Sequence, residues 1–581
     1  MTTCRSHAWH MVVATTLALS IFVFASPGDK DENAEVKFSA HTDLVLIPAL
    51  VTEKSGKHIT GLKQEDFAVF ENGAEQKIAT FEEITSDAHR LLPRSDPKEF
   101  SNVLAGDPAA KRVTVIVLDF INTPFAAQAA GRQELLKYLT QSLDVREPTA
   151  LYTLTRSGIR VVHNFTTDPQ ILVAALHKVK GDAYQMVDSE EDVEAITGTA
   201  APDGSTGPDA PTPALSSSSK GSAQSSMQAE AAQLQAMLED AELNFQSFEQ
   251  RLAITYTLQG MQQVAQALAG FPGRKSLIWA SGGFPFSVSD NSMQLAPAGR
   301  DTLADVLPMY ERTWQLLNDA QISLYPVDVK GLQVVTLPSA SVRNPGKNYA
   351  RHASWKQMDT QSSFEVFASM TGGRAYFNSN DLVKGFRDAV NDSSQYYLLG
   401  YYLDHSKTKP GWRKLSVKVK REHTEVRARS GFFVTNATVD PAKSRNNDIA
   451  SALLSPLDFS SLALTAHWDK VEAAKDPAKK HVNYEMRLAA DKGVINEADN
   501  NHVALDFVVL AVTPEGKKIG QPTGQSVDVH IPAEKLPGIR QRGLVYRDAL
   551  DLAPGDYSVR FVVRDDLNGR TGSVVAPLKV D

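Results

Sequence analysis

Cysteine is almost absent from this chain, and its one position excludes several kinds of chemistry. The only cysteine among 581 residues is Cys4, which lies in a segment that we expect to be removed on export. A mature chain without thiols has no disulfide framework, thiolate metal site, catalytic thiol or redox centre. Ordinary hydrophobic cores must therefore stabilise it.

The chain also lacks an excess of positive charge and, beyond its amino terminus, any apolar run long enough to cross a membrane. Its formal net charge is −8, and because nucleic-acid-binding domains need a basic face we expect no nucleic-acid partner. Hydrophobic residues make up 42% and charged residues 22%, which argues against a wholly disordered chain. A length of 581 residues predicts several domains.

The amino terminus has the pattern of a secretory signal peptide. Arg5 precedes an apolar run from Met11 to Phe24, and small residues follow the run. We predict cleavage after Ala25, so that residues 1–25 are the signal peptide and the mature protein is secreted or periplasmic, without a membrane span. An uncleaved anchor is the alternative, but the run is short for a span. Because Cys4 precedes the run, it cannot serve as a lipoprotein acceptor.

The most informative stretch is Lys111 to Pro124, where an unbroken apolar run ends in polar residues. The run is followed by Asp119, and a helical pattern begins near Gln128. An apolar run of this kind predicts a central parallel strand that is buried on both faces. Asp119, Asn122 and Thr123 are therefore expected at the carboxyl end of a strand, where open α/β sheets bind ligands.

Strand and helix patterns continue to alternate after this stretch. Further buried strands are expected within Phe271 to Phe284, between a turn and a loop, and at Ile322 to Val329, with a helical pattern between them. We therefore predict, for residues 111–392, the α/β fold class: a doubly wound, mostly parallel sheet, flanked in the chain by β-sandwich domains.

Two segments inside this region have distinct patterns. Residues 181–226 are rich in Asp, Glu, Ser, Pro, Thr and Gly, so we predict a disordered insertion there. A long helical pattern follows from Met227 to Leu268, as one helix or two. Before the insertion, Asp168 followed by Pro169 predicts the capped start of a helix.

Two groups of β patterns flank the α/β region. Residues 36–85 contain three expected strands and the turn signal Asn72-Gly73, and residues 393–435 contain more strands. Since each group alone buries too little apolar surface, we predict that they pack together as one sandwich, with the α/β domain inserted between them. Residues 86–110 are interpreted as a connector, and residues 455–581 as a separate C-terminal β-sandwich.

Several of these segments resemble a known family. The chain is similar to von Willebrand factor A-type domains, and more closely to the A-domain-related secreted proteins described from acidobacteria. The first strand of an A domain ends in Asp-x-Ser-x-Ser, and the match here is Asp119-Phe120-Ile121-Asn122-Thr123. Residues 59–73 and 370–377 are also similar to the family, and the resemblance covers roughly Val36 to Thr435. It implies a von Willebrand A-like, Rossmann-like fold.

The resemblance also implies a site for a hard divalent cation, which the family holds with these residues and with a Thr and an Asp from later loops. The matching positions are Asp119, Asn122, Thr123, Thr257 and Ser281, with Thr255 as an alternative to Thr257. Ile121 replaces one hydroxyl ligand, and Ser281 replaces the later Asp. Because Mg²⁺ has little affinity for sites with few carboxylates, we expect weak Mg²⁺ binding or none. The simplest alternative is that Asp119 only caps the next helix.

The resemblance implies an exported, non-enzymatic protein that binds another protein or a cell-surface component through this degenerate metal-ion-dependent adhesion site. An architectural protein with a vestigial site is the alternative. A serine hydrolase is a third hypothesis, because Trp279 to Gly283 resembles the Gly-x-Ser-x-Gly turn around a nucleophile, which would be Ser281. Trp279 stands where that turn needs a small residue, however, so we expect no enzyme.

Overall fold

The computed structural model describes most of the chain after residue 41. The described ranges are 42–85, 98–103, 112–143, 147–180, 221–289, 292–294, 303–331, 361–379, 381–404, 409–434, 441–490, 493–514 and 516–581. The expected signal peptide with Cys4 and residues 181–220 of the expected insertion lie outside these ranges. Within them, no helix is both long enough and apolar enough to span a membrane.

The predicted fold class is wrong. Strands make up 43% of the structure and helices 30%, and of the six sheets in the described ranges five contain only antiparallel pairs. The chain is therefore a largely antiparallel, β-rich protein and not a doubly wound parallel α/β fold of the Rossmann type. The prediction took the fold class from residues 111–392, but the flanking segments supply most of the strands that the structure describes.

Parallel pairing is confined to one five-stranded sheet in the order β12-β9-β6-β7-β8. Its parallel strands are β6 (Thr114–Asp119), β7 (Thr149–Thr155), β9 (Lys275–Ser281) and β12 (Ile322–Asp328), and β8 (Gly158–Thr166) pairs antiparallel at one edge. Every residue of β6, β9 and β12 is buried, which explains their unbroken apolar runs.

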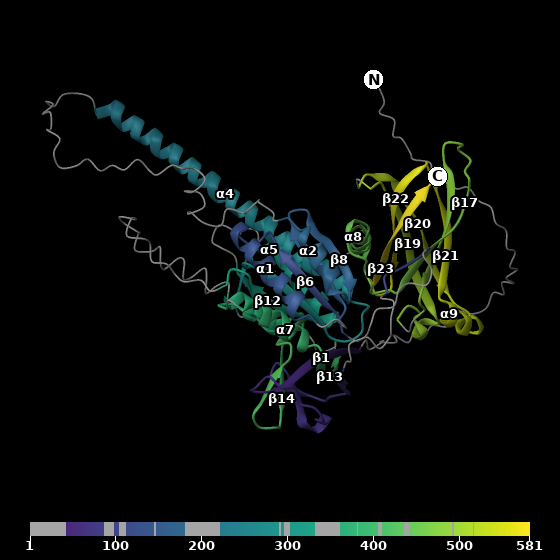
Figure 1. Ribbon diagram of the computed structural model, residues 1–581, viewed down its shortest axis with the longest axis horizontal. Helices are drawn as coiled ribbons and strands as arrows, with labels where there is room; N and C mark the ends of the chain where they lie inside the picture. Colours follow the sequence, from purple (N-terminus) through teal and green to yellow (C-terminus); the bar gives the residue numbers. More distant parts are fainter. Residues whose placement is uncertain are drawn as a thin grey trace, which may run out of the picture. The chain divides into compact units, whose positions relative to one another are not determined.

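Helices cover both faces of this mixed sheet (Figure 1). One face packs against α1 (Phe125–Gln141), α2 (Pro169–His177) and α7 (Leu382–Asn391), and the other against α4 (Gly221–Leu268), α5 (Leu303–Asp319) and the helical residues 361–371. The predicted insertion, residues 181–226, extends too far, because residues 221–226 are helical and form the start of α4. Ala223 and Gln224 favour helix, and extending an existing helix costs little.

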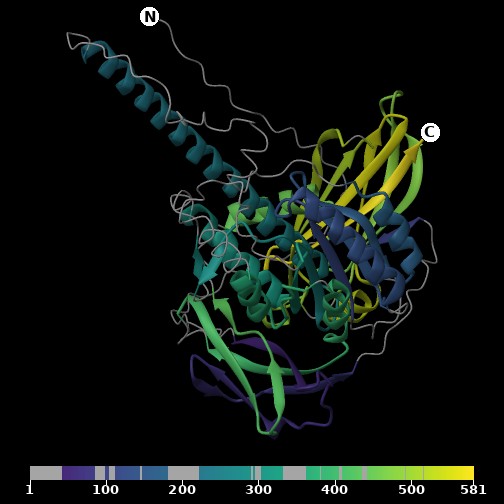
Figure 2. The same cartoon turned by 60° about the vertical axis from the view of Figure 1, so that its left-hand side comes forward.

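The two flanking β segments form two four-stranded sheets together. Their orders are β15-β1-β13-β4 and β16-β14-β2-β3, and Figures 1 and 2 show the purple amino-terminal strands beside the green ones. The bounds are β1 (Thr42–Glu53), η1 (Gln64–Asp66), β2 (Phe67–Glu71), β3 (Ala74–Gln76), β4 (Thr80–Thr85), β13 (Gln395–Asp404), β14 (Gly411–Val419), β15 (Thr424–Arg427) and β16 (Gly431–Val434). Phe67 and Tyr397 meet in their common core with ring centroids 5.0 Å apart.

The C-terminal part also has two sheets, in the orders β21-β18-β17-β5 and β20-β19-β22-β23. The bounds are β5 (Glu99–Ser101), α8 (Pro441–Leu454), β17 (Leu464–Ala473), β18 (Lys480–Leu488), η4 (Glu497–Asp499), β19 (His502–Val512), β20 (Lys518–His530), η5 (Ala533–Lys535), α9 (Leu536–Arg542), β21 (Leu544–Leu552), β22 (Gly555–Asp565) and β23 (Thr571–Val580). β5 lies within residues 86–110, which were interpreted as a connector, and it pairs with β17.

A small hairpin of β10 (Ser287–Ser289) and β11 (Ser292–Gln294) completes the described strands.

Candidate functional site

The sequence-predicted site residues meet at the carboxyl ends of the parallel strands. Asp119 is the last residue of β6 and Ser281 the last of β9. Asn122 and Thr123 lie in the loop between β6 and α1, and Thr257 lies on α4. All five are buried.

The Asp119 carboxylate is the centre of this cluster and receives five hydrogen bonds. Its Oδ1 accepts from the backbone amides of Ile121 at 3.1 Å and Asn122 at 3.0 Å. Its Oδ2 accepts from Nδ2 of Asn122 at 2.7 Å, Nε1 of Trp279 at 3.0 Å and Oγ of Ser281 at 2.9 Å. Both oxygens are therefore fully used by the protein itself.

The remaining predicted residues extend this network. Nδ2 of Asn122 also donates to Oγ1 of Thr257 at 2.8 Å, and the amide of Gly282 donates to Oγ1 of Thr123 at 2.9 Å. Gly282 must be small, since a Cβ there would lie 2.9 Å from the carbonyl oxygen of Asn122. Thr255, the alternative to Thr257, is outside the network, because its hydroxyl donates to the carbonyl of Arg251.

Burial sets the protonation behaviour of the acids at these strand ends. It raises the pKa of Asp119, and the hydrogen bonds from Asn122, Trp279 and Ser281 oppose that rise. Burial likewise raises the pKa of Asp328, the last residue of β12, and the nearby Lys330 opposes it. Asp328 is paired in register with Ser281, so a second acid lies one strand away from the cluster.

The cluster does not fit a magnesium ion. Mg²⁺ requires oxygen ligands in an octahedron at about 2.0–2.1 Å. Here Asp119 is the single carboxylate, and three polar hydrogens, from Asn122, Trp279 and Ser281, point at its Oδ2 where a cation would have to bind. A cation would displace these donors and leave them buried without partners. Weak Mg²⁺ binding or none remains the prediction.

Ser281 is also poorly placed to act as a nucleophile. Its side chain is fully buried, and its hydroxyl lies between Oδ2 of Asp119 and the carbonyl oxygen of Gly283, which is 2.6 Å away. Within the described ranges no histidine is hydrogen-bonded to it, so no general base is in place. Trp279 fills the position that a nucleophile turn keeps small, and its indole donates to Asp119 instead.

Sequence reasoning missed the part that Trp279 plays in the cluster. Trp279 and Ser281 are two residues apart on β9, so their side chains point to the same side of the strand. Because Asp119 was expected at the same strand ends, this spacing could have indicated that Trp279 lies on the side of its strand that Ser281 shares with Asp119.

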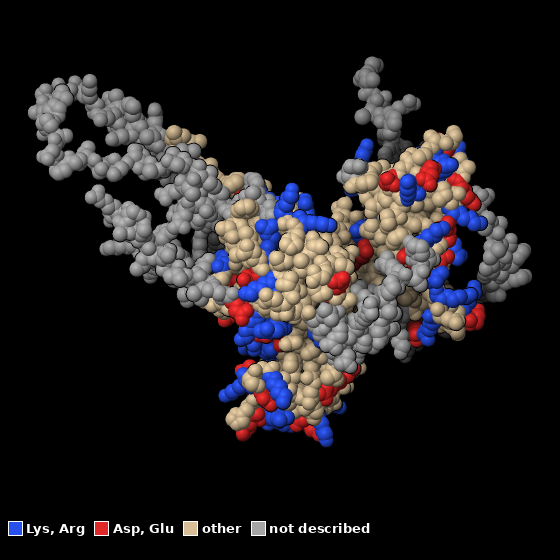
Figure 3. Space-filling model, in the orientation of Figure 1, with Lys and Arg blue, Asp and Glu red and all other residues tan. Residues whose placement is uncertain are grey.

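A second feature missed from the sequence is a basic groove beside the cluster, with a volume of about 920 Å³. Phe120, the residue after Asp119, forms part of its wall, together with the β7–β8 hairpin and the end of α2. We call it the cationic groove, because it is lined by Arg156, Arg160, His163, Lys178 and Lys180 and by no carboxylate. Figure 3 shows Lys and Arg side chains gathered over this end of α2 and the hairpin.

Most of the charge in the cationic groove is not neutralised locally. Arg156 forms an ion pair with Glu249 at 2.6 Å. Arg160 donates to the hydroxyl of Ser157 at 3.0 Å and is exposed, as are Lys178 and Lys180. No carboxylate in the described part of the chain forms an ion pair with these last three side chains. On a chain with a net charge of −8, the groove is a local exception.

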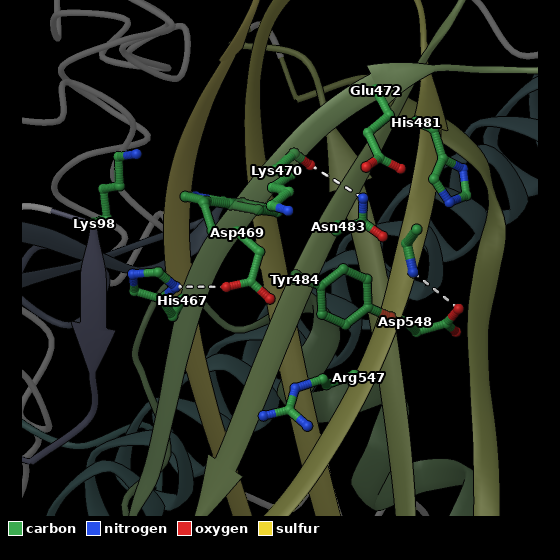
Figure 4. A pocket seen from close by; sticks show the side chains of 12 residues that line it. Lys98, His467, Asp469, Lys470, Glu472, His481, Asn483, Tyr484, Arg547 and Asp548 are labelled. Carbon is green, nitrogen blue, oxygen red and sulfur yellow. Dashed lines mark hydrogen bonds and ion pairs between the residues drawn. The ribbon is translucent and has the colours of Figure 1, made fainter.

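The C-terminal part has a hollow of similar size, about 850 Å³, in the sheet that contains β17, β18 and β21 (Figure 4). Its lining carries both signs of charge, and two of its charged or titratable groups have acidic partners on the same sheet. His467 lies 3.2 Å from Asp469, and Arg547 pairs with Glu485 at 2.6 Å. This mixed hollow therefore has no preference for anions that compares with that of the cationic groove.

Comparison with known proteins does not show a family for this chain. The sequence matches no protein-family model, and a comparison with curated proteins gives no significant match. The resemblance to the von Willebrand A-type family stays a prediction.

Proposed function

We propose that the protein is a non-enzymatic binding protein that acts outside the cytoplasm and holds an extended acidic segment of a partner protein in the cationic groove. The observation that carries this proposal is the groove itself, which has four Lys or Arg side chains and no carboxylate in its lining. The Asp119 cluster acts as the rigid support of the loop beside it. In this proposal no metal ion takes part in binding.

The Asp119 cluster cannot contact a partner directly. Asp119 is 1% exposed and Ser281 is 0% exposed, and their polar atoms already bond to one another. What the cluster can do is fix the path of the chain from Asp119 to Thr123. Because Phe120 is part of this loop and of the groove wall, the network holds one side of the groove in place.

The cationic groove replaces the charge that a bound metal would supply. In a metal-dependent adhesion site, an acid from the partner completes the coordination of the cation. Here Arg160, Lys178 and Lys180 offer positive charge directly, and cations clustered in a hollow attract anions more strongly than isolated surface charges do. The two lysines follow the carboxyl end of α2, where positive charge is also favoured by the helix dipole.

The shape of the groove favours a peptide over a small anion. β8 is the last strand of its sheet, so one side of its backbone is unpaired by any other strand of that sheet. An extended segment can add to such an edge through main-chain hydrogen bonds. Ile171, which is 42% exposed, adds an apolar contact on the opposite wall. A partner segment with acidic residues and at least one apolar side chain matches this lining.

Peptide binding tests the proposal. Fluorescence anisotropy should show that labelled decaglutamate binds to the full chain at low ionic strength, while decaglutamine of the same length does not. Binding should weaken as salt is added, because exposed charges are screened. The variant Arg160→Glu/Lys178→Glu/Lys180→Glu should bind at least about tenfold more weakly, since each change replaces attraction by repulsion. Equal binding of the two peptides, or of the variant, would refute the proposal.

Export is the second part of the proposal and rests on residues 1–25. Mass spectrometry of the protein from the extracytoplasmic fraction should give a mature chain beginning at Ser26. A mature protein that retains Cys4 would contradict it.

A further inference from the structure

Two histidines face each other at one end of the sheet that contains β19 and β20. His502 opens β19 and His530 closes β20, and the two residues are directly paired in register. Their rings are stacked, with centroids 4.6 Å apart and an angle of 7° between the ring planes. Side chains opposite one another on antiparallel strands can act on the same ligand.

The chain before β19 brings an acid to the same place. Asp499 ends η4, and Asn500 and Asn501 then adopt the left-handed conformation with φ of 48° and 59°. This turn folds the chain back, so that Oδ2 of Asp499 lies 3.0 Å from Nδ1 of His502. Asp528, two residues before His530 on β20, lies on the other side of the ring, with Oδ1 2.7 Å from Nε2 of His502.

We propose that Asp499, His502 and His530 form a binding site for Zn²⁺. One ligand atom from each of these residues lies within 4.8 Å of the other two. Two ligands at zinc bond lengths of about 2.0–2.2 Å are roughly 3.3–3.5 Å apart in a tetrahedron. The present 3.0 Å between Asp499 and His502 is close to that separation, so these two side chains need only a small shift and the exposed side chain of His530 makes the larger adjustment. Zinc takes the place of the proton that now joins Asp499 and His502.

Asp528 has a separate part in this site. When Nδ1 of His502 coordinates the ion, Nε2 carries the proton and donates it to Asp528 at 2.7 Å. A carboxylate behind a metal-bound histidine fixes its tautomer and orientation, and makes it a better ligand. The arrangement holds three protein ligands, and the fourth position is left for water or for a group of another molecule.

The site is open to solvent, which suits an ion that is taken up from outside the cell. Side-chain exposure is 59% for Asp499 and 15% for His502. The side chain of His530 is exposed, and apart from the ring stack it has no described hydrogen bond or ion pair. Substitution of His530 therefore removes a ligand without disturbing the fold, which makes it the decisive position for a test.

Zinc titration of the full chain tests the proposal. After removal of metals with a chelator, calorimetry should show binding of one Zn²⁺ per chain with micromolar affinity, and Co²⁺ should give the visible absorption bands of a tetrahedral site. His530→Ala, His502→Ala and Asp499→Asn should each weaken binding at least about tenfold. His481→Ala is the matched control, because His481 also pairs with an acid, Asp551 at 2.7 Å, on the neighbouring sheet of the same part of the chain.

Each result of the zinc titration either supports the site or contradicts it. Binding that is lost in His530→Ala and kept in His481→Ala supports the site. Absence of zinc binding by the unmodified chain, or equal binding by His530→Ala, overturns it. The assay does not involve the cationic groove, so its result is independent of the proposed function.

Discussion

The Asp119 cluster and the cationic groove lie next to each other at the same strand ends, but their polar groups find partners in opposite ways. Asp119 receives five hydrogen bonds from its own chain and is hidden from solvent. Arg160, Lys178 and Lys180 are exposed, and no described carboxylate neutralises them. A polar group whose partners are internal stabilises the fold, and one whose partners are missing can bind another molecule.

The largest expected effect comes from breaking the internal network. Asp119→Ala leaves the donors of Trp279 and Asn122 buried without an acceptor, so we expect the free energy of unfolding to fall by about 3 kcal/mol or more. Urea unfolding followed by tryptophan fluorescence measures the loss. Ser281→Ala is the graded control, because it keeps the Asp119 carboxylate and removes only the hydroxyl that bonds to Asp119 and to the backbone of Gly283, which should cost only about 1 kcal/mol. If Asp119→Ala lowers the free energy of unfolding by less than about 1 kcal/mol, the network does not stabilise the fold.

A charge reversal in the groove should affect binding and leave stability unchanged. Arg160→Glu should weaken decaglutamate binding several-fold, and the free energy of unfolding should change by less than about 0.5 kcal/mol, as for most surface substitutions. The matched control is Arg547→Glu in the mixed hollow of Figure 4, and it should leave peptide binding unaltered. An equal loss in both variants would mean that the peptide senses only total charge.

Asp168 shares a property with each region, because its side chain is exposed like those of the cationic groove and hydrogen-bonded to its own chain like that of Asp119. Its side chain accepts from the amide of Gln170 at 2.8 Å and caps α2. Asp168→Ala should reduce the free energy of unfolding by about 1 kcal/mol. Since the change also removes a negative charge near the groove, peptide binding should not weaken. Weaker binding would show that α2 is displaced.

The smallest expected effect is a pH dependence at His502. Hydrogen bonds that the His502 ring donates to the carboxylates of Asp528 and Asp499 raise the pKa of His502, and His530 is the only other titratable group described against its ring. The stabilisation is complete below the unfolded pKa of about 6.5 and is lost as pH rises through the higher folded value. Melting temperatures of the metal-free chain should therefore fall slightly over that interval. His502→Ala should flatten this part of the profile, and an unchanged profile would contradict the assignment.

Much of the site's position, but little of its chemistry, could be predicted from the sequence. Asp119, Asn122 and Ser281 were expected together because they follow buried strands, and the structure joins them by hydrogen bonds. The hydrogen bond from the indole of Trp279 was missed, because the spacing from Ser281 indicates the side of the strand that the ring faces but not which acceptor its N–H reaches. The cationic groove was missed for a similar reason. Arg160 lies on β8 and Lys178 follows α2, and only the packing of that helix beside the strand brings their side chains to one groove.

For the fold, too, single elements could be predicted from the sequence, but their arrangement in sheets could not. Long buried runs such as β6 and β9 are recognisable one at a time. The fold class was wrong because antiparallel sheets formed by distant segments outweigh the single mixed sheet. β5 has only three residues, too few to show a period of two, and α8 follows a polar stretch that gives no strong helical stripe.

The most direct test of the central claim is the affinity for decaglutamate measured with the same protein in EDTA and in excess Mg²⁺. If side chains of the cationic groove supply the positive charge, the dissociation constants in the two solutions at matched ionic strength should agree. Binding that requires Mg²⁺ and disappears in EDTA would show that a metal ion, and not the groove, recognises the acid.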